Sequence, residues 1–139
     1  MIWIVDASVA IKWFVPTEEY REQVLQVLED IQKSPQRFGV PELFFNEVLT
    51  VLCRVGDHVQ NVIMDIDRME NLGLNRVGNG HELLEETVRS SKKYHLTGYD
   101  ALYVATAKLM KGVWLTADYK AYKRITDPGL ACFLPDYCL

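Results

Sequence analysis

Cysteine is scarce in this sequence, and its spacing excludes two common kinds of site. Cys53, Cys132 and Cys138 are the three cysteines among 139 residues. No two of them have CxxC spacing, so neither a zinc ribbon nor a thioredoxin-like redox site is expected. The default interpretation is three thiols in a reducing compartment. Whether Cys132 and Cys138 form a disulfide is an open question, because spacing alone does not decide it.

Long hydrophobic runs and an excess of positive charge are also missing. Residues 1–6 lack the basic and long apolar regions of a signal peptide, and no uncharged apolar run approaches membrane-spanning length. We therefore expect a cytoplasmic protein. The net charge of −4 argues against a nucleic-acid coat protein, which is usually basic. It leaves open an enzyme that meets a phosphate backbone through metal ions, because such a site needs carboxylates.

Several catalytic motifs are absent. The sequence contains no GxxxxGK[ST] loop and no GxSxG elbow, and Gly78-x-Gly80 lacks a third glycine at dinucleotide-binding spacing. His58, His81 and His95 stand alone, which is typical of surface or helix residues. These absences exclude the common nucleotide-binding loops and the serine hydrolase elbow.

What remains is an ordinary globular composition, with 49% hydrophobic and 24% charged residues. A chain of this length has enough apolar material for one core, and we expect a single domain over residues 1–139. Short apolar runs alternate with amphipathic segments, which predicts an α/β fold with a mainly parallel sheet of four or five strands. Strands are expected at 2–5, 37–40, 74–77, 113–116 and 131–134, and helices at 7–14, 18–33, 41–55, 58–71, 82–94, 97–111 and 119–125.

Two helix starts and one helix face are predicted in more detail. Thr17 resembles an N-cap for the helix at 18–33, and Pro41 suits the first turn of the helix at 41–55. The apolar face of the first of these helices should comprise Val24, Leu25, Val27, Leu28 and Ile31.

Two acids follow expected strands. Asp6 comes directly after the strand at 2–5, and Asp118 lies two residues beyond the strand at 113–116. In an open parallel sheet, ligands bind beyond the carboxyl ends of the strands, so both acids are candidates for a site. Each is also a typical N-cap residue, and capping does not exclude metal binding.

Glu47 conflicts with its surroundings. Leu43, Phe44 and Val51 share its helix face. A carboxylate in an apolar stripe costs several kcal/mol unless a charge compensates it. A bound cation would do so; a salt bridge, or a rotation that places Glu47 at the edge of the core, are the alternatives.

Asp100 is the single acid between Leu96 and Ala117, in a helix that is small or apolar up to Ala107. This composition predicts deep packing. The structural alternative is a capping box, with Thr97 as N-cap and Asp100 at the third helical position.

Asp6, Glu47, Asp100 and Asp118 together form a hard, all-oxygen ligand set, which suits Mg²⁺ or Mn²⁺ and disfavours zinc. Metal held in this way activates water and stabilises charge on a phosphodiester. Ser8 and Thr116 are candidates to hold a carboxylate or water behind the ligands, although both are equally typical of helix-start and strand-end hydroxyls.

Basic residues near these acids, interleaved with aromatic ones, are candidates for RNA contact, although basic runs are more often solvated faces. The candidates are Lys12, Lys120, Lys123 and Arg124.

Four segments resemble PIN domains, and the VapC-type toxins of prokaryotic toxin–antitoxin pairs in particular. They are VDAS at 5–8, PELFFNEV at 41–48, YDALY at 99–103 and VWLTAD at 113–118. The likeness covers nearly the whole chain, in order. Asp6, Glu47, Asp100 and Asp118 match the acidic quartet of the family, and Thr116 matches a frequent hydroxyl behind it. The chain departs from the family at Thr50, where many relatives have Asn, and in having no acid at 119–126.

The resemblance implies a three-layer α/β/α sandwich, a Mg²⁺- or Mn²⁺-dependent endoribonuclease, a homodimer, and a cognate antitoxin that covers the acidic site. It leaves open a PIN-domain RNA-processing nuclease without an antitoxin. The residues themselves allow two more interpretations. A phosphatase using Asp6 as nucleophile would want a second acid where Ser8 stands, and a receiver-like or partner-binding module would use the acids structurally.

Overall fold

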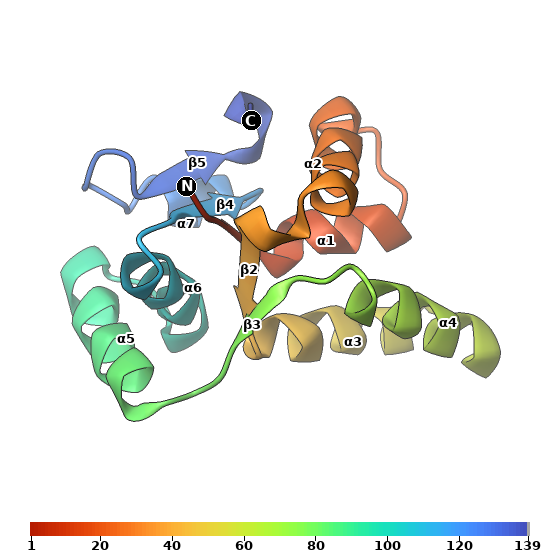
Figure 1. Cartoon of the computed structure of the whole chain (residues 1–139), viewed down its shortest axis with the longest axis horizontal. Helices are drawn as coiled ribbons and strands as arrows, with labels where there is room; N and C mark the ends of the chain where they lie inside the picture. Colours follow the sequence, from red (N-terminus) through yellow and green to blue (C-terminus); the bar gives the residue numbers. More distant parts are fainter. Residues whose placement is uncertain (139) are drawn as a thin grey trace.

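A computed structural model describes residues 1–138 and shows a five-stranded, all-parallel sheet in the order β3-β2-β1-β4-β5 (Figure 1). The predicted α/β class and parallel sheet are therefore confirmed. The strands are β1 (Trp3–Val5), β2 (Phe38–Pro41), β3 (Asn75–Val77), β4 (Val113–Thr116) and β5 (Ala131–Phe133). The helices are α1 (Ala7–Phe14), α2 (Arg21–Lys33), α3 (Leu43–Val55), α4 (Val59–Glu70), α5 (His81–Tyr94), α6 (Gly98–Leu109) and α7 (Tyr119–Tyr122), with 3₁₀ turns η1 (Pro35–Arg37) and η2 (Leu134–Asp136).

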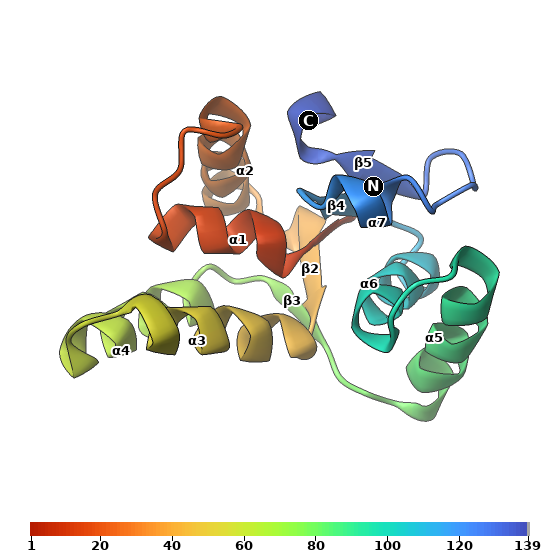
Figure 2. The same ribbon diagram turned by 180° about the vertical axis from the view of Figure 1, so that it is seen from behind.

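Helices cover both faces of the sheet, which gives the expected three layers. Helices α1 and α2 lie on one side of the sheet, and α5 and α6 lie on the other (Figures 1 and 2). Helix α6 packs across β2, β1 and β4, while α3 packs along α1. Residues 101–107 of α6 are buried without interruption, as befits a helix covered by the sheet on one side and by α5 on the other.

Strand β1 is the centre of the sheet. Its three residues are all buried, and Ile4 pairs with Gly39 of β2 and Trp114 of β4. A strand covered on both faces has a continuous apolar sequence, which explains why residues 2–5 lack polar alternation.

The strand order decides between two interpretations. Receiver-like proteins have the order 2-1-3-4-5, whereas this sheet has 3-2-1-4-5. The receiver-like interpretation is therefore wrong. In the observed order the direction of winding reverses between β1 and β4, and the carboxyl ends of these two strands form the crevice in which such sheets bind ligands. Asp6 and Asp118 follow these two strands.

Three details of the predicted elements are wrong. Helix α2 begins at Arg21, because Thr17 accepts a hydrogen bond from Glu19 N (3.2 Å) and so closes a local turn. Pro41 ends β2 instead of opening α3, because the chain stays paired to β3 until Glu42 N donates to Val77 O (3.0 Å). Leu25 is 48% exposed, since the buried face of α2 follows Val24, Val27 and Ile31.

Helix α7 is also shorter than predicted and ends at Tyr122 rather than at residue 125. The following residues continue in turns, with Arg124 N bonded to Ala121 O and Ile125 N to Tyr122 O. The three thiols are free, as the default interpretation expected. Burial raises the pKa of the Cys132 thiol to about 11, which keeps it protonated near neutral pH. No helix within residues 1–138 is both long and apolar enough to cross a membrane.

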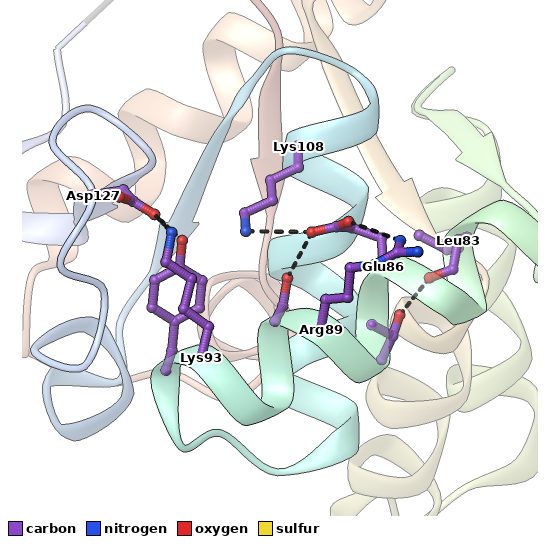
Figure 3. A network of polar contacts seen from close by, with 9 residues as sticks. Leu83, Glu86, Arg89, Lys93, Lys108 and Asp127 are labelled. Atoms are coloured by element: carbon purple, nitrogen blue, oxygen red, sulfur yellow. Dashed lines mark hydrogen bonds and ion pairs between the residues drawn. The ribbon is translucent and has the colours of Figure 1, made fainter.

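A polar network holds α5 against α6 and the β4–β5 connection (Figure 3). Glu86 forms an ion pair with Lys108 of α6 (3.3 Å) and accepts a hydrogen bond from the hydroxyl of Ser90 (3.3 Å). Asp127, in the loop before β5, accepts from Lys93 (2.8 Å) and from the Tyr94 hydroxyl. The side chains of Glu86 and Lys108 are mostly buried, so their pair is less screened than a surface pair. Through Lys108, the network ties α5 to α6, the helix that carries Asp100.

Gly112 permits the close approach of the chain entering β4 to the chain entering β1. A Cβ atom at this position would lie 2.4 Å from the carbonyl oxygen of Ile2, which accepts a hydrogen bond from Val113 N. We expect Gly112→Ala to lower the free energy of unfolding by about 3 kcal/mol, measured by denaturant titration. Gly78→Ala is the control, because no atom lies within 4 Å of its added Cβ. Equal stability of the two variants would contradict this packing.

Candidate metal centre

All four predicted acids line one cavity of about 510 Å³ beyond the carboxyl ends of β1 and β4. Each comes from a different part of the chain: Asp6 precedes α1, Glu47 lies in α3, Asp100 in α6, and Asp118 precedes α7. The remaining lining residues are Ala7, Ser8, Ile11, Leu43, Asn46, Thr50, Val51 and Tyr99.

Asp6 is the most deeply placed of the four, with 7% of its surface exposed. Its Oδ2 accepts from Ser8 N (2.9 Å), which makes it the N-cap of α1, and its Oδ1 accepts from Trp114 Nε1 (3.1 Å). Burial raises its pKa from 3.8 to about 6, and the negative charge of Glu47 adds to this. The capping interpretation is therefore correct, and the same carboxylate is held rigidly against the cavity.

Glu47 is half-buried, and its Oε1 accepts from the hydroxyl of Tyr103 (2.7 Å). None of the ion pairs formed within residues 1–138 includes Glu47. Burial raises its pKa, and the charge of Asp100 raises it further. The salt-bridge interpretation is therefore wrong, and Glu47 lies at the edge of the core with a neutral hydroxyl as partner.

Residues 101–107 of α6 are buried, as the prediction of deep packing expected, but the side chain of Asp100 itself is only half-buried. Thr97 is the N-cap of α6 and accepts from Asp100 N (3.2 Å), which confirms the capping bond from Thr97. Burial and the charge of Asp118 raise the pKa of Asp100. Asp118 is exposed and caps α7 by accepting from Ala121 N (3.1 Å).

Ser8 and Thr116 connect the two strand ends from behind. Ser8 Oγ accepts from Ala117 N (3.0 Å) and lies 3.4 Å from Thr116 Oγ1, which accepts from Asp118 N (3.0 Å). The two hydroxyls thus fix the backbone that carries Asp118 beside the start of α1. This is a positioning arrangement, and a role of both residues behind metal ligands stays a prediction.

The donor set fits a hard divalent cation in its chemistry. Every candidate ligand is a carboxylate, and three of the four carboxylates have pKa values raised by burial and by one another, the condition that a bound divalent ion relieves. The side chains do not yet converge, because within residues 1–138 no three acids, histidines or cysteines form a ready group of metal ligands. Binding would therefore require carboxylate side chains to turn further into the cavity.

The four basic candidates separate into two pairs. Lys120 and Arg124 line a hollow of about 200 Å³ that shares Asp100 and Asp118 with the main cavity. Lys12 and Lys123 line neither space; Lys12 Nζ lies 6.0 Å from the centre of the Tyr20 ring, and Lys123 Nζ lies 4.9 Å from that of Tyr119.

Sequence reasoning missed three aromatic residues at the site. Tyr103 holds Glu47, Trp114 holds Asp6, and Tyr99 lines the cavity with 65% of its surface exposed. Tyr103 had one available signal, because it lies three residues after Asp100 and so shares its helix face.

The fold and the site define an open parallel α/β protein with an acidic crevice at the point where its winding reverses. The family model of the PIN domain matches residues 3–127. The chain therefore belongs to the PIN domain family. No curated protein matches the sequence significantly.

Solved structures share this fold at low sequence identity. A toxin–antitoxin complex from Klebsiella pneumoniae has a TM-score of 0.70 and 20% identity, over 94% of this chain and 96% of that one. VapBC2 from Rickettsia felis, bound to a DNA fragment from their promoter, has a TM-score of 0.71 and 13% identity over the same shares. FitAcB from Neisseria gonorrhoeae has a TM-score of 0.68 and 14% identity, over 88% and 92%.

Proposed function

We propose that this chain is a Mg²⁺- or Mn²⁺-dependent endoribonuclease, and the toxin of a VapBC-type toxin–antitoxin pair, built as one nuclease domain over residues 1–139. The observation that carries the proposal is the meeting of Asp6, Glu47, Asp100 and Asp118 in one cavity of a PIN domain. These carboxylates are the proposed metal ligands and catalytic residues. Their number and crowding are hard to explain by helix capping alone, because Glu47 caps no helix.

The protein would hold its ligands from behind. When bound, the ion supplies activation of the attacking water and neutralisation of the charge that develops on the phosphodiester. Trp114 and the backbone of Ser8 fix Asp6, and Tyr103 fixes Glu47. Burial and nearby acids keep the hydroxyl of Tyr103 protonated by raising its pKa, so it remains a donor to Glu47. Such supports limit the motion of the ligands to the side chains themselves.

The antitoxin partner rests on the resemblance to VapC-type toxins and on the Klebsiella pneumoniae structure, which is a toxin–antitoxin complex. Exposed apolar side chains give a protein partner something to cover. Leu49, Val59 and Ile63 line an apolar groove of about 430 Å³ between α3 and α4. A homodimer and a cytoplasmic location remain expectations, and the solution mass of the purified chain decides the first.

Cleavage of a mixed pool of structured RNAs tests the proposal. We expect cleavage with Mn²⁺ or Mg²⁺, none with EDTA, and none by Asp100→Asn, because the amide cannot supply the missing negative charge. Cleavage that persists in both controls would place the activity elsewhere. If no RNA is cut, Mn²⁺ titration by calorimetry decides, and absence of binding would reject the metal-dependent nuclease.

A phosphatase with Asp6 as nucleophile is the remaining enzymatic interpretation. Both oxygens of Asp6 accept hydrogen bonds from the protein, and Ser8 uses its hydroxyl to hold Ala117 N. A carboxylate whose two oxygens are both held is poorly placed to attack a phosphate. Ser8, which stands where a phosphatase would want its second acid, is also already in use. A phosphorylated intermediate trapped on Asp6 would support the phosphatase over the nuclease.

A further inference from the structure

The hollow beside the acidic cavity has a composition that catalysis by the acids does not explain. Its lining includes two acids, Asp100 and Asp118, and two cations, Lys120 and Arg124. Neither cation forms an ion pair within residues 1–138, although both line the same hollow as two acids. Two cations beside the proposed reaction centre therefore remain available for an anion.

Arg124 is held in place for this role. Its Nη1 donates to the carbonyl oxygen of His95 (2.7 Å), in the connection between α5 and α6. The positive charge of Arg124 lowers the pKa of Asp100 against the larger effect of burial, so the guanidinium acts on the same space as this carboxylate. Lys120, at the start of α7, lines the same hollow as Arg124.

The neighbouring face of α7 carries aromatic rings. Tyr119 is 52% exposed, and its ring stacks on Tyr122 (6.3 Å between centroids) and contacts Phe133 of β5 (5.1 Å). Lys123 lies over the Tyr119 ring. A half-exposed ring that already attracts a cation to its face suits the stacking of an unpaired base, which would take the place of Lys123 over the ring.

We propose that residues 119–124 form a subsite for single-stranded RNA, in which Lys120 and Arg124 bind the phosphate next to the scissile one and Tyr119 stacks the adjoining base. The inference rests on the proposed function, because it takes the acidic cavity as the place of cleavage. It requires an unpaired strand, since the bases of a duplex are already stacked and present no free face to Tyr119. The subsite would hold the strand across Asp118, between the aromatic face and the acids.

Binding without cleavage tests the subsite. A fluorescein-labelled 12-nucleotide single-stranded RNA is titrated with protein in EDTA, and its anisotropy is followed over a series of salt concentrations. Lys120→Gln should weaken binding about fivefold at low salt and reduce the slope of log affinity against log salt by about 0.7, the value for one lost contact to a single strand. Arg124 is left intact, because it also holds His95.

The stacking part has its own pair of variants. Tyr119→Leu should weaken binding about fivefold or more, whereas Tyr119→Phe keeps the ring and should bind like the wild type. Lys92→Gln is the matched charge control, because Lys92 is exposed on α5 and lines neither space. Duplex RNA of the same sequence should bind more weakly than the single strand.

The outcomes separate the subsite from the nuclease. Wild-type affinity of both Lys120→Gln and Tyr119→Leu, equal binding of duplex RNA, or no binding of the single strand would overturn the subsite, whatever the cleavage assay shows. Binding that weakens as expected, by a protein that neither cleaves RNA nor binds Mn²⁺, would support the subsite and reject the nuclease alone.

Discussion

Asp6→Asn should lower the rate of metal-dependent RNA cleavage by about a thousandfold or more, while the protein stays folded. Asp6 is the acid whose position is fixed most completely, with both oxygens held by donors and its backbone at the end of the central strand. An amide keeps the size of the side chain but removes its negative charge. The loss should therefore appear in cleavage at saturating Mn²⁺ and not in the circular dichroism spectrum.

Asp136→Asn is the control for this substitution, because Asp136 is exposed in η2 and lines neither the cavity nor the neighbouring hollow. It should cleave at the wild-type rate. A folded Asp6→Asn protein with that rate would remove Asp6 from the catalytic set.

The wild type and Asp6→Asn should also differ in the pH dependence of stability when metal is removed. The pKa of Asp6 is about 6 in the folded chain and 3.8 in its ordinary state, so the folded protein binds the extra proton between these values. Stability from this group is therefore greatest at low pH and falls as pH rises. Between pH 4 and 7 the wild type should lose about 2 kcal/mol relative to Asp6→Asn.

Denaturant unfolding of both proteins in EDTA at several pH values measures this difference. Comparing the two removes the opposite contributions of Glu42 and Asp127, whose pKa values are lowered by ion pairs and whose stabilisation grows with pH. Added Mn²⁺ should reverse the loss at pH 7, because it binds the folded state. A difference that does not change with pH would mean that Asp6 is already ionised at pH 4.

The sequence predicts the elements well where hydrophobic runs end at turn residues. Strand β4 and helix α1 have the predicted bounds, because Gly112 and Pro16 mark the start of one and the end of the other. The errors at Thr17 and Pro41 have a common cause. Each residue type suits both a helix start and another local structure. A local turn decided the outcome at Thr17, and strand pairing with β3 decided it at Pro41. Strand order was not predictable, since the same alternation is compatible with both doubly wound orders.

An acid of the candidate site was predictable where it stood in an otherwise apolar segment or just after a strand. Glu47 stood out in an apolar stripe, and Asp6 and Asp118 followed strands whose ends meet in a parallel sheet. The supports were not predictable, because their partners are distant in the chain. Tyr103 lies 56 positions from Glu47, and Trp114 lies 108 positions from Asp6. No local pattern specifies such pairs.

The central place of β1 in the sheet also determines when the chain can complete its fold during synthesis. Ile4 pairs with Trp114, so the first strand to leave a ribosome waits for a neighbour encoded 110 positions later. At the usual pace of translation that interval is about 5 to 20 seconds. Until then the sheet lacks its second half and the four carboxylates have no common cavity. A nascent chain released before β4 emerges would therefore carry none of the assembled acidic centre, however much of the polypeptide had been made.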